Sequence, residues 1–530
     1  MRDPIYCPKD KDTVNRAGAP AYKTDIYTAT VSYLMTGSTR GTFYASGAKI
    51  AEEAEKTFEE IAQKDIEFLA QACVYARLKG YLKLMPIVGT VVVSKHSPKY
   101  FHRIAPAVCR IPSDWVKLID VCRSKRIRQG VGTAIKKEIR KFIYNLRDSP
   151  MRDYWAIKYR SAFRYMILNA HVPVRYNPDL VRWAMNLEPS NDYFRNYKAL
   201  SHISDPSRIA EAIRKYRYPF EVCTRLAKDY TEVWTALMEV APILNAIRNV
   251  RTFARHRVFA DEHNVDTMVR KLTSQGNIAD SMIFPFRPYQ AYSELKKLSL
   301  RNVSENDFPT AYRKELLNAL EVTTMLSINN VPKYDGRIAI LLDVSGSMWW
   351  TDVARTVRAA EVATLFAYAI ARKCGRVVIV PFDYAAYPDG GVEIATAHTP
   401  VEAIDWARGI GGGGTSLAVA MEYLIDNKID VDRIIAITDN EEWLAGGYTK
   451  SFKDALVTYT RRVRDSFDAY LITVAPSAHA PVKFESAVAK LSPKIPNVNI
   501  YGVFGWSDNV LKFALSRGTQ IDEIRDCITL

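Results

Sequence analysis

Apolar residues recur at helical spacing between residues 48 and 325, with almost no strand-like alternation. The segment 133–146 is the clearest case. Its apolar face carries Ile135, Ile139, Phe142, Ile143 and Leu146, and its opposite face carries Lys136, Lys137, Arg140 and Lys141. The same spacing predicts helices over 48–76, 155–169, 180–185, 205–215, 232–250, 265–272 and 311–328. Amphipathic helices in series, punctuated by Pro and Gly, favour a HEAT-like α-helical repeat.

After Asp335 the pattern changes to short apolar runs that alternate with amphipathic segments. The predicted strands are 337–343, 376–382, 433–439, 470–475 and 498–504, and the predicted helices are 353–372, 415–426, 452–464 and 509–516. This alternation is typical of a doubly wound α/β domain with a parallel sheet. We therefore predict two domains, a helical one over 1–335 and an α/β one over 336–530.

Charge divides along the same boundary. The 530 residues have a formal net charge of +15, of which residues 1–335 hold +18 and residues 336–530 hold −3. The densest basic stretch is 123–164. Such an imbalance is the electrostatic footprint of nucleic-acid binding. For the basic helix 133–146, a solvated outer face and contact with RNA phosphates both remain open.

Several protein classes do not fit the composition. Hydrophobic residues make up 48% and charged residues 25%, as in globular proteins. We find no uncharged apolar run long enough to span a membrane, and the first residues lack the apolar core of a secretion signal. The seven cysteines are scattered without a C-x-x-C pair, which favours reduced thiols over disulfides or zinc. We expect a cytoplasmic protein without a membrane partner.

Hydroxyl and carboxylate side chains follow three predicted strands or loops of the α/β part. Asp343, Ser345 and Ser347 close the first strand, Thr415 follows the glycine run 411–414, and Asp439 closes a later strand. In parallel sheets such positions meet at one edge. Hard oxygen ligands suit a divalent cation, with Mg²⁺ the preferred ion. Asp343 alone would be better explained as a helix N-cap, so the prediction depends on the whole set of five residues. The glycine run lacks the following Gly-Lys-Ser/Thr of a phosphate loop.

The motif set as a whole resembles the Ro autoantigen family. Residues 343–347, Thr415 and Asp439 resemble the metal-ion-dependent adhesion site of a von Willebrand factor A domain. Segments similar to the family's TROVE domain lie at 34–44, 132–137, 234–239, 247–249 and 283–287. The resemblance implies a ring of HEAT-like helices closed by the von Willebrand A-like domain. It also implies noncoding RNA partners, with single-stranded 3′ ends in the central hole and Y-like RNA on the basic outer surface.

The segment 158–171 is similar to a family segment that contacts RNA. By this resemblance Lys158, Arg160, Arg164 and His171 are candidate RNA contacts, together with Lys136, Lys137, Arg140 and Lys141 of the basic helix. Phe163 departs from the family pattern, because it stands where the family has an RNA-contacting histidine. For His171, a buried structural histidine is an equally open reading.

Two functional hypotheses follow. The first is a monomeric RNA-binding ring used in noncoding RNA quality control, acting beside a 3′ exoribonuclease as bacterial family members can. The second is a metal-dependent interaction or assembly module, in which the few protein charges around the ion leave a position open for the carboxylate of an acidic protein ligand. An enzyme is not expected: a single metal site with mostly neutral ligands lacks an obvious general base for a nuclease.

Overall fold

A computed structural model describes most of the chain. The described residues are 13–18, 20–36, 42, 45–80, 82–124, 126–188, 191–281, 283–297, 304–354, 356–441, 451–475, 478–481, 489–492, 495–505, 508–515 and 520–530. They form two compact units. The sheet unit contains the chain up to His96, Phe284–Phe286 and the chain from Ile328; the helical unit contains Ser97–Ile283 and Arg287–Ser327. Residues 37–41, 43 and 44 of the predicted family segment 34–44 lie outside the described residues.

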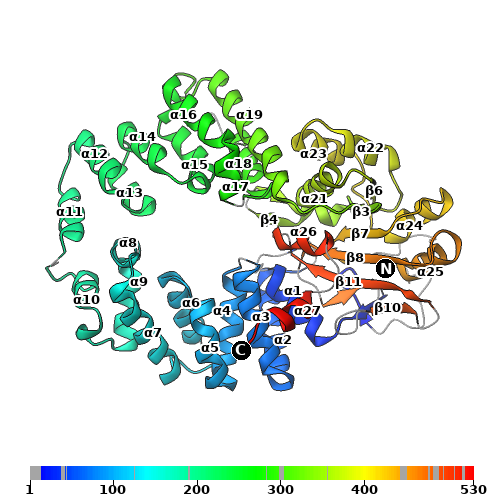
Figure 1. Cartoon of the computed structure of the whole chain (residues 1–530), viewed down its shortest axis with the longest axis horizontal. Coiled ribbons are helices and arrows are strands. Elements are labelled where there is room, and N and C mark those ends of the chain that lie inside the picture. The colour runs from blue at the N-terminus through cyan, green and yellow to red at the C-terminus, as the bar shows by residue number, and fades with distance from the viewer. Residues whose placement is uncertain are drawn as a thin grey trace. The chain divides into compact units, whose positions relative to one another are not determined.

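The helical unit is built from short helices in series (Figure 1). They are α5 (Pro98–Val108), α6 (Pro112–Arg123), α7 (Thr133–Asn145), α8 (Arg152–Lys158), α9 (Arg160–Ala170), α10 (Pro178–Ala184), α11 (Asp192–Leu200), α12 (Pro206–Tyr216), α13 (Phe220–Ala227), α14 (Thr231–Val240), α15 (Ile243–Arg255), α16 (Glu262–Thr273), α17 (Gln275–Asp280), α18 (Phe286–Lys296) and α19 (Thr310–Ser327). Each packs mainly on helices close by in sequence, as α7 does on α9 and α12 on α14. The predicted helical repeat is confirmed.

Three predicted helices are each two helices in the structure. Tyr159 separates α8 from α9, and Pro242 separates α14 from α15 because proline supplies no N–H to continue the first helix. In the sheet unit, Asp65 separates α2 (Gly47–Lys64) from α3 (Ile66–Leu78). Its carboxylate accepts a hydrogen bond from the backbone N–H of Phe68 and caps the second helix. Hydrophobic spacing continued across all three breaks, and therefore did not reveal them.

The predicted doubly wound sheet is confirmed in the sheet unit. Five parallel strands, β3 (Ile338–Asp343), β6 (Val377–Phe382), β7 (Arg433–Thr438), β8 (Phe467–Thr473) and β11 (Ile495–Phe504), are joined at one edge by the antiparallel β10 (Ala489–Ser492). The order is β10-β11-β8-β7-β3-β6. The chain therefore leaves β3 toward β6 and returns to β7 on its other side, which makes the β3–β7 gap the switch point of the fold.

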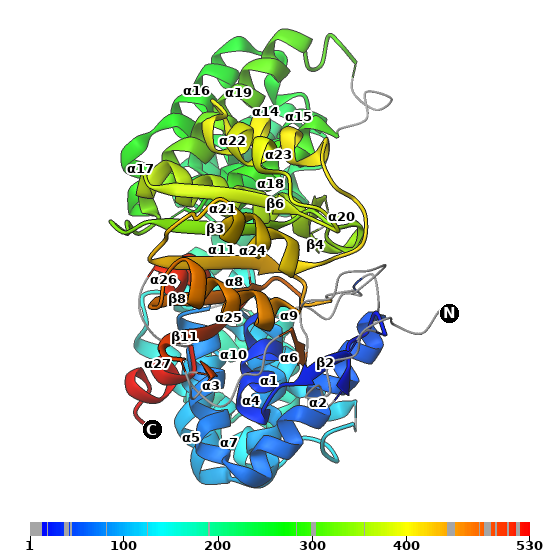
Figure 2. The same cartoon turned by 90° about the vertical axis from the view of Figure 1, so that its right-hand side faces the viewer.

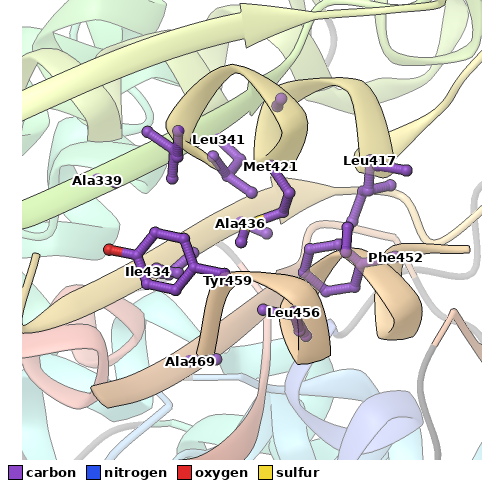
Figure 3. Close-up of a cluster of buried hydrophobic side chains, with 14 of the residues drawn as sticks. Ala339, Leu341, Leu417, Met421, Ile434, Ala436, Phe452, Leu456, Tyr459 and Ala469 are labelled. Atoms are coloured by element: carbon purple, nitrogen blue, oxygen red, sulfur yellow. The ribbon is translucent and has the colours of Figure 1, made fainter. Parts of the chain in front are cut away.

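Helices cover this sheet and bury its central strands (Figure 2). They include α21 (Ala359–Cys374), α24 (Leu417–Asp426), α25 (Phe452–Arg462) and α26 (Asp508–Leu515). On one face, Leu341, Ile434 and Ala436 of the sheet pack against Met421 of α24 and Leu456 of α25 (Figure 3). Every residue of β3 and β7 is buried, which explains their continuous apolar sequence.

The sequence prediction differs from the structure in several elements of this unit. The segment predicted as the start of a helix contains the paired strands β4 (Asp352–Ala354) and β5 (Val357–Arg358), so α21 begins only at Ala359. The helices α20 (Gly346–Trp350), α22 (Pro388–Thr396), α23 (Pro400–Arg408) and α27 (Gln520–Cys527) were not predicted. No described helix is long and apolar enough to cross a membrane.

The N-terminal helices belong to the sheet unit, although the sequence boundary after Asp335 groups them with the helical region. They are α1 (Ile26–Thr36), α2, α3 and α4 (Leu84–His96). The Gln71 amide of α3 donates to the carbonyl of Ile528 over 2.7 Å. A three-stranded sheet, β1 (Thr13–Val14), β2 (Pro20–Lys23) and β9 (His479–Ala480), also pairs the N-terminal segment with residues that follow β8. The compact units therefore do not coincide with the sequence-based domains.

Candidate metal centre and basic surface

The five predicted metal ligands are all buried at the carboxyl edge of the sheet. Asp343 is the last residue of β3, and Asp439 directly follows β7. Since these strands are neighbours in the sheet, the two carboxylates flank the switch point. This is where doubly wound sheets bind ligands.

Hydrogen bonds link four of the five residues. The Asp343 carboxylate accepts from the backbone N–H of Ser345 over 2.9 Å. The hydroxyls of Ser345 and Ser347 lie 3.2 Å apart, and Ser347 donates to the Asp439 carboxylate. Thr415 is buried after the glycine run, but its side chain makes no hydrogen bond to these four residues, all of which the structure describes.

The glycine run packs directly on the D-x-S-x-S loop. The N–H of Gly346 donates to the carbonyl of Gly413 over 2.9 Å, and the N–H of Gly412 donates to that of Val344 over the same distance. A Cβ on Gly346 would lie 2.9 Å from the Gly412 oxygen. Gly411 and Gly412 also have φ values of +74° and +101°. Glycine is therefore required for close approach as well as for the turn.

Burial and the repulsion between two neighbouring carboxylates make this sheet edge unfavourable for ionised aspartates that lack a cation. Burial raises the pKa of Asp343 to about 7, with a further contribution from the negative charge of Asp439. Burial also raises the pKa of Asp439. A divalent cation would supply the missing positive charge, and buried carboxylate and hydroxyl oxygens are the donors that Mg²⁺ prefers. The residues present therefore fit such an ion.

Three residues that support this edge were not predicted. Thr438 donates to Asp343 over 2.6 Å. The buried carboxylate of Asp383 accepts from the N–H of Gly413 over 3.0 Å and so holds the glycine run. Glu441 lies two residues after Asp439, and burial together with that neighbour raises its pKa to about 8. The sequence Asp439-Asn440-Glu441 at a strand end was the available signal for the last of these.

Glu441 is engaged by the N-terminal segment. One of its carboxylate oxygens accepts from the backbone N–H groups of Arg16 and Ala17 over 2.8 and 3.3 Å. The Arg16 guanidinium binds Glu53 of α2 over 2.7 Å. Among the described residues, no group of three His, Cys, Asp or Glu side chains is arranged to hold a metal. The candidate site thus depends on its hydroxyls as well as its two aspartates.

The eight predicted RNA contacts all lie in the helical unit, and the structure divides them into two sets. Lys137, Lys141, Arg164 and His171 are exposed, and Lys136 is half-buried. The four cations of this set form no ion pair with any residue that the structure describes. His171 ends α9 in the left-handed conformation, with φ +51°. The alternative reading of His171 as a buried histidine is wrong.

The other three cations make contacts within the protein. Arg140 Nε donates to the carbonyl of Ala170 over 2.7 Å, at the C-terminus of α9. Lys158 binds Glu221 over 2.8 Å. Arg160 lies 4.2 Å above the ring of Trp183. Arg160 also donates over 3.0 Å to the Trp183 carbonyl and to the side chain of Asn186. These contacts give Arg140, Lys158 and Arg160 a structural role. Phe163 is fully buried.

Comparisons with known proteins cover both the sheet edge and the basic helices. A family model described as the Ro60 vWA domain matches residues 337–482, a segment that contains all five candidate ligands. The "RNA-binding protein RO60" of Deinococcus radiodurans is 22% identical over 458 residues, covering 82% of this chain and 84% of that protein. The crystal structure of a Deinococcus radiodurans RO (RSR) protein matches with a TM-score of 0.65 and 19% identity, over 92% of this chain and 98% of that one. The chain resembles the Ro proteins.

The Ro resemblance predicted from the motifs is thus confirmed, and it extends beyond the α/β part. A second relative, the "RNA-binding protein RO60" of Caenorhabditis elegans, is 24% identical over 287 residues. That match covers 53% of this chain and 42% of the worm protein. The Ro60-type segment supplies the sheet edge with its candidate metal ligands, and the region before it supplies the exposed cations.

Proposed function

We propose that this chain is an RNA-binding Ro protein that binds RNA phosphates on the basic surface of α7 and α9. The observation that carries the proposal is the set of exposed cations Lys137, Lys141 and Arg164, which have no carboxylate partner in the described structure. Lys137 and Lys141 lie one turn apart on α7, and Arg140 joins α7 to the end of α9. Two relatives named as RNA-binding proteins support the same assignment.

The finer part of the proposal concerns the RNA. We infer structured or misfolded noncoding RNA with a single-stranded 3′ end, including Y-like RNA, and a role in noncoding RNA quality control in the cytoplasm. Contacts to phosphates give affinity that is strongly salt-dependent and largely independent of sequence. Such a surface would accept many structured RNAs. A monomer acting beside a 3′ exoribonuclease is part of the same inference.

Filter binding across a salt series tests this proposal. We expect Lys137→Glu with Lys141→Glu to weaken binding of a structured RNA at least tenfold and to reduce the salt slope by about 2. The matched control, Arg270→Glu with Lys314→Glu, makes the same charge change at exposed positions of α16 and α19. Equal losses in both double variants would overturn the assignment to α7.

A second candidate function belongs to the sheet edge. We propose that Asp343, Ser345, Ser347, Thr415 and Asp439 hold Mg²⁺, which would offer a Lewis-acid position to the carboxylate of an acidic protein ligand. The observation that favours it is the burial of two aspartates beside three hydroxyls at the switch point of the sheet. Because Glu441 is already held by Arg16 and Ala17, we propose an interaction site and not a nuclease. Degradation of RNA by the purified protein in Mg²⁺ would contradict this.

Thermal unfolding with and without Mg²⁺ tests the metal. At a hundred times its dissociation constant, an ion that binds only the folded state stabilises by about 2.7 kcal/mol. We expect this stabilisation in the wild type and in Asp389→Ala, whose side chain is exposed on α22. We expect none in Asp343→Ala. If Mg²⁺ stabilised Asp343→Ala as much as the wild type, the proposed metal site would be wrong.

A further inference from the structure

Three tyrosine rings surround Tyr218 in the helical unit. Tyr193 and Tyr197 lie one turn apart on α11, Tyr216 ends α12, and Tyr218 lies in the connection to α13 (Figure 1). The ring centroids of Tyr193, Tyr197 and Tyr216 lie 4.8, 5.3 and 5.4 Å from that of Tyr218. Nothing in the proposed phosphate surface of α7 and α9 uses these residues. We call this group the tyrosine cluster.

The cluster combines half-exposed rings with a buried polar atom that lacks a partner. Tyr218 is 2% exposed, and its hydroxyl has no hydrogen-bond partner among the described residues. Tyr193, Tyr197 and Tyr216 are half-buried, so part of each ring faces solvent. A buried hydroxyl without a partner is unfavourable and is rare in native proteins. It indicates a partner that the described residues do not provide.

The hydroxyls of Tyr193 and Tyr218 remain protonated at neutral pH. Burial raises the pKa of Tyr218, and repulsion from Tyr193 and Tyr216 raises it further. Burial likewise raises the pKa of Tyr193. Each group therefore offers both an O–H donor and an acceptor oxygen beside an aromatic face. Nucleobases present complementary features, namely a π-face and polar edges.

Cations without carboxylate partners border the cluster. Lys215 lies 5.2 Å from the ring centre of Tyr216, and the charge of Arg225 acts on Tyr197 and lowers its pKa against the effect of burial. Lys215, Arg217 and Arg225 are exposed and form no ion pair within the described structure. They would repel one another unless an anion lay nearby.

We propose that the tyrosine cluster is a stacking site for unpaired nucleobases of single-stranded RNA. In this assignment Tyr193 and Tyr197 stack on bases, Tyr218 hydrogen-bonds to a base or ribose, and Lys215, Arg217 and Arg225 neutralise the flanking phosphates. The inference rests on the proposed RNA-binding function and adds a second, chemically different contact to it. Aromatic surfaces can also hold proline-rich peptides. The unpaired cations favour the polyanion.

Two RNAs separate this site from the basic surface of α7. One is a blunt hairpin, and the other is the same hairpin with a 3′ tail of eight adenosines that contains one 2-aminopurine. Fluorescence anisotropy measures the affinity of each RNA, and 2-aminopurine quenching reports stacking in the tail. The variants are Tyr193→Leu with Tyr197→Leu, and Tyr218→Phe, which keeps the ring and removes only the hydroxyl. Tyr312→Leu changes a half-buried tyrosine of α19 as the control.

We expect the wild type and Tyr312→Leu to bind the tailed hairpin more tightly than the blunt one and to quench 2-aminopurine. The double leucine variant should lose about tenfold or more in affinity for the tailed RNA, together with the quenching, and retain blunt-hairpin binding. Tyr218→Phe should lose a smaller part of the tail affinity. Melting temperatures confirm that each variant folds.

Three results would overturn the proposal. The first is equal wild-type affinity for the two hairpins, or tail affinity and quenching that survive in both tyrosine variants. The second is displacement of the tail by oligoproline with no displacement by oligoadenylate, which would identify a peptide site. The third is failure of the wild type to bind either RNA, which would instead remove the RNA-binding function on which the inference rests. If only the Lys137→Glu, Lys141→Glu variant loses blunt-hairpin binding, the result supports the α7 surface and does not contradict the proposal for the tyrosine cluster.

Discussion

The carboxyl edge of the sheet and the basic helices α7 to α9 both gather charged side chains, and they treat them in opposite ways. At the sheet edge Asp343 and Asp439 are buried together, with raised pKa values. In the helical unit the predicted cations are either exposed or half-buried without an ion pair, or held by a partner within the protein, as Arg160 is by Trp183. The buried like charges are the ground on which we propose a cation at the sheet edge. The exposed charges support the proposed RNA contact only after the cations with partners inside the protein are set aside.

The largest expected effect comes from breaking the support beneath the sheet edge. Asp383→Ala removes the acceptor for the N–H groups of Gly413 and Ala385 and for the Tyr387 hydroxyl. Because these donors then lose their partner in a largely buried site, we expect a loss of about 3 kcal/mol in the free energy of unfolding, measured in urea. Asp389→Ala should change it by less than about 0.5 kcal/mol. Equal stability of the two variants would contradict the supporting role of Asp383.

The next largest effect tests the difference between cations that are held by partners within the protein and cations that are exposed. Arg160→Ala should cost about 2 kcal/mol of unfolding free energy, because it removes the contact with Trp183 and the hydrogen bonds to its carbonyl and to Asn186. Arg164→Ala, four residues later and exposed, should leave stability unchanged and weaken RNA binding instead. Urea unfolding and filter binding on the same two preparations measure both outcomes. A reversed pattern would exchange the roles assigned to the two arginines.

Sequence patterns predicted the fold best where a single signal was long and unambiguous. The apolar runs that became β3 and β7 are buried on both faces, so their composition alone identified them. Breaks within helical spacing were missed because Asp65 and Tyr159 interrupt the backbone without interrupting the apolar stripe. The paired strands β4 and β5 were missed because apolar residues just before α21 continue the helical pattern.

The candidate site was predictable only in part, for a related reason. Asp343 and Asp439 follow recognisable strands, so their types and positions were sufficient. The role of Asp383 depends on a backbone contact to Gly413 that no sequence spacing encodes. The same holds for Arg160, a candidate RNA contact by resemblance, because no sequence spacing encodes its packing on the ring of Trp183. Side chains that stabilise a site through backbone groups require the structure.

The smallest expected effect is a change in how the free energy of unfolding depends on pH. His256 stacks on Trp234 with ring centroids 4.1 Å apart. Burial lowers its pKa and Arg255 adds to this, while Asp229 opposes it. The sheet edge disfavours negative charge, and this position disfavours positive charge. An unfolded histidine has a pKa near 6.5, so in that range the unfolded chain binds more protons at His256 than the folded one. The contribution of His256 to the free energy of unfolding must therefore fall as the pH drops below about 6.5.

Between pH 7.5 and 5 the free energy of urea unfolding of the wild type should therefore fall relative to that of His256→Gln. The comparison is made as a difference because the raised pKa values of Asp343 and Glu441 contribute the opposite pH dependence equally to both proteins. Some dependence should remain in the variant, because burial also lowers the pKa of His479 in the sheet unit. The control His398→Gln alters an exposed imidazole beside Glu402 and should follow the wild type. A His256→Gln slope identical to that of the wild type would mean that the stacked imidazole accepts a proton as readily as it does in the unfolded chain. In that case the position of His256 beside Trp234 would not disfavour positive charge, and the contrast with the sheet edge, which disfavours negative charge, would be wrong.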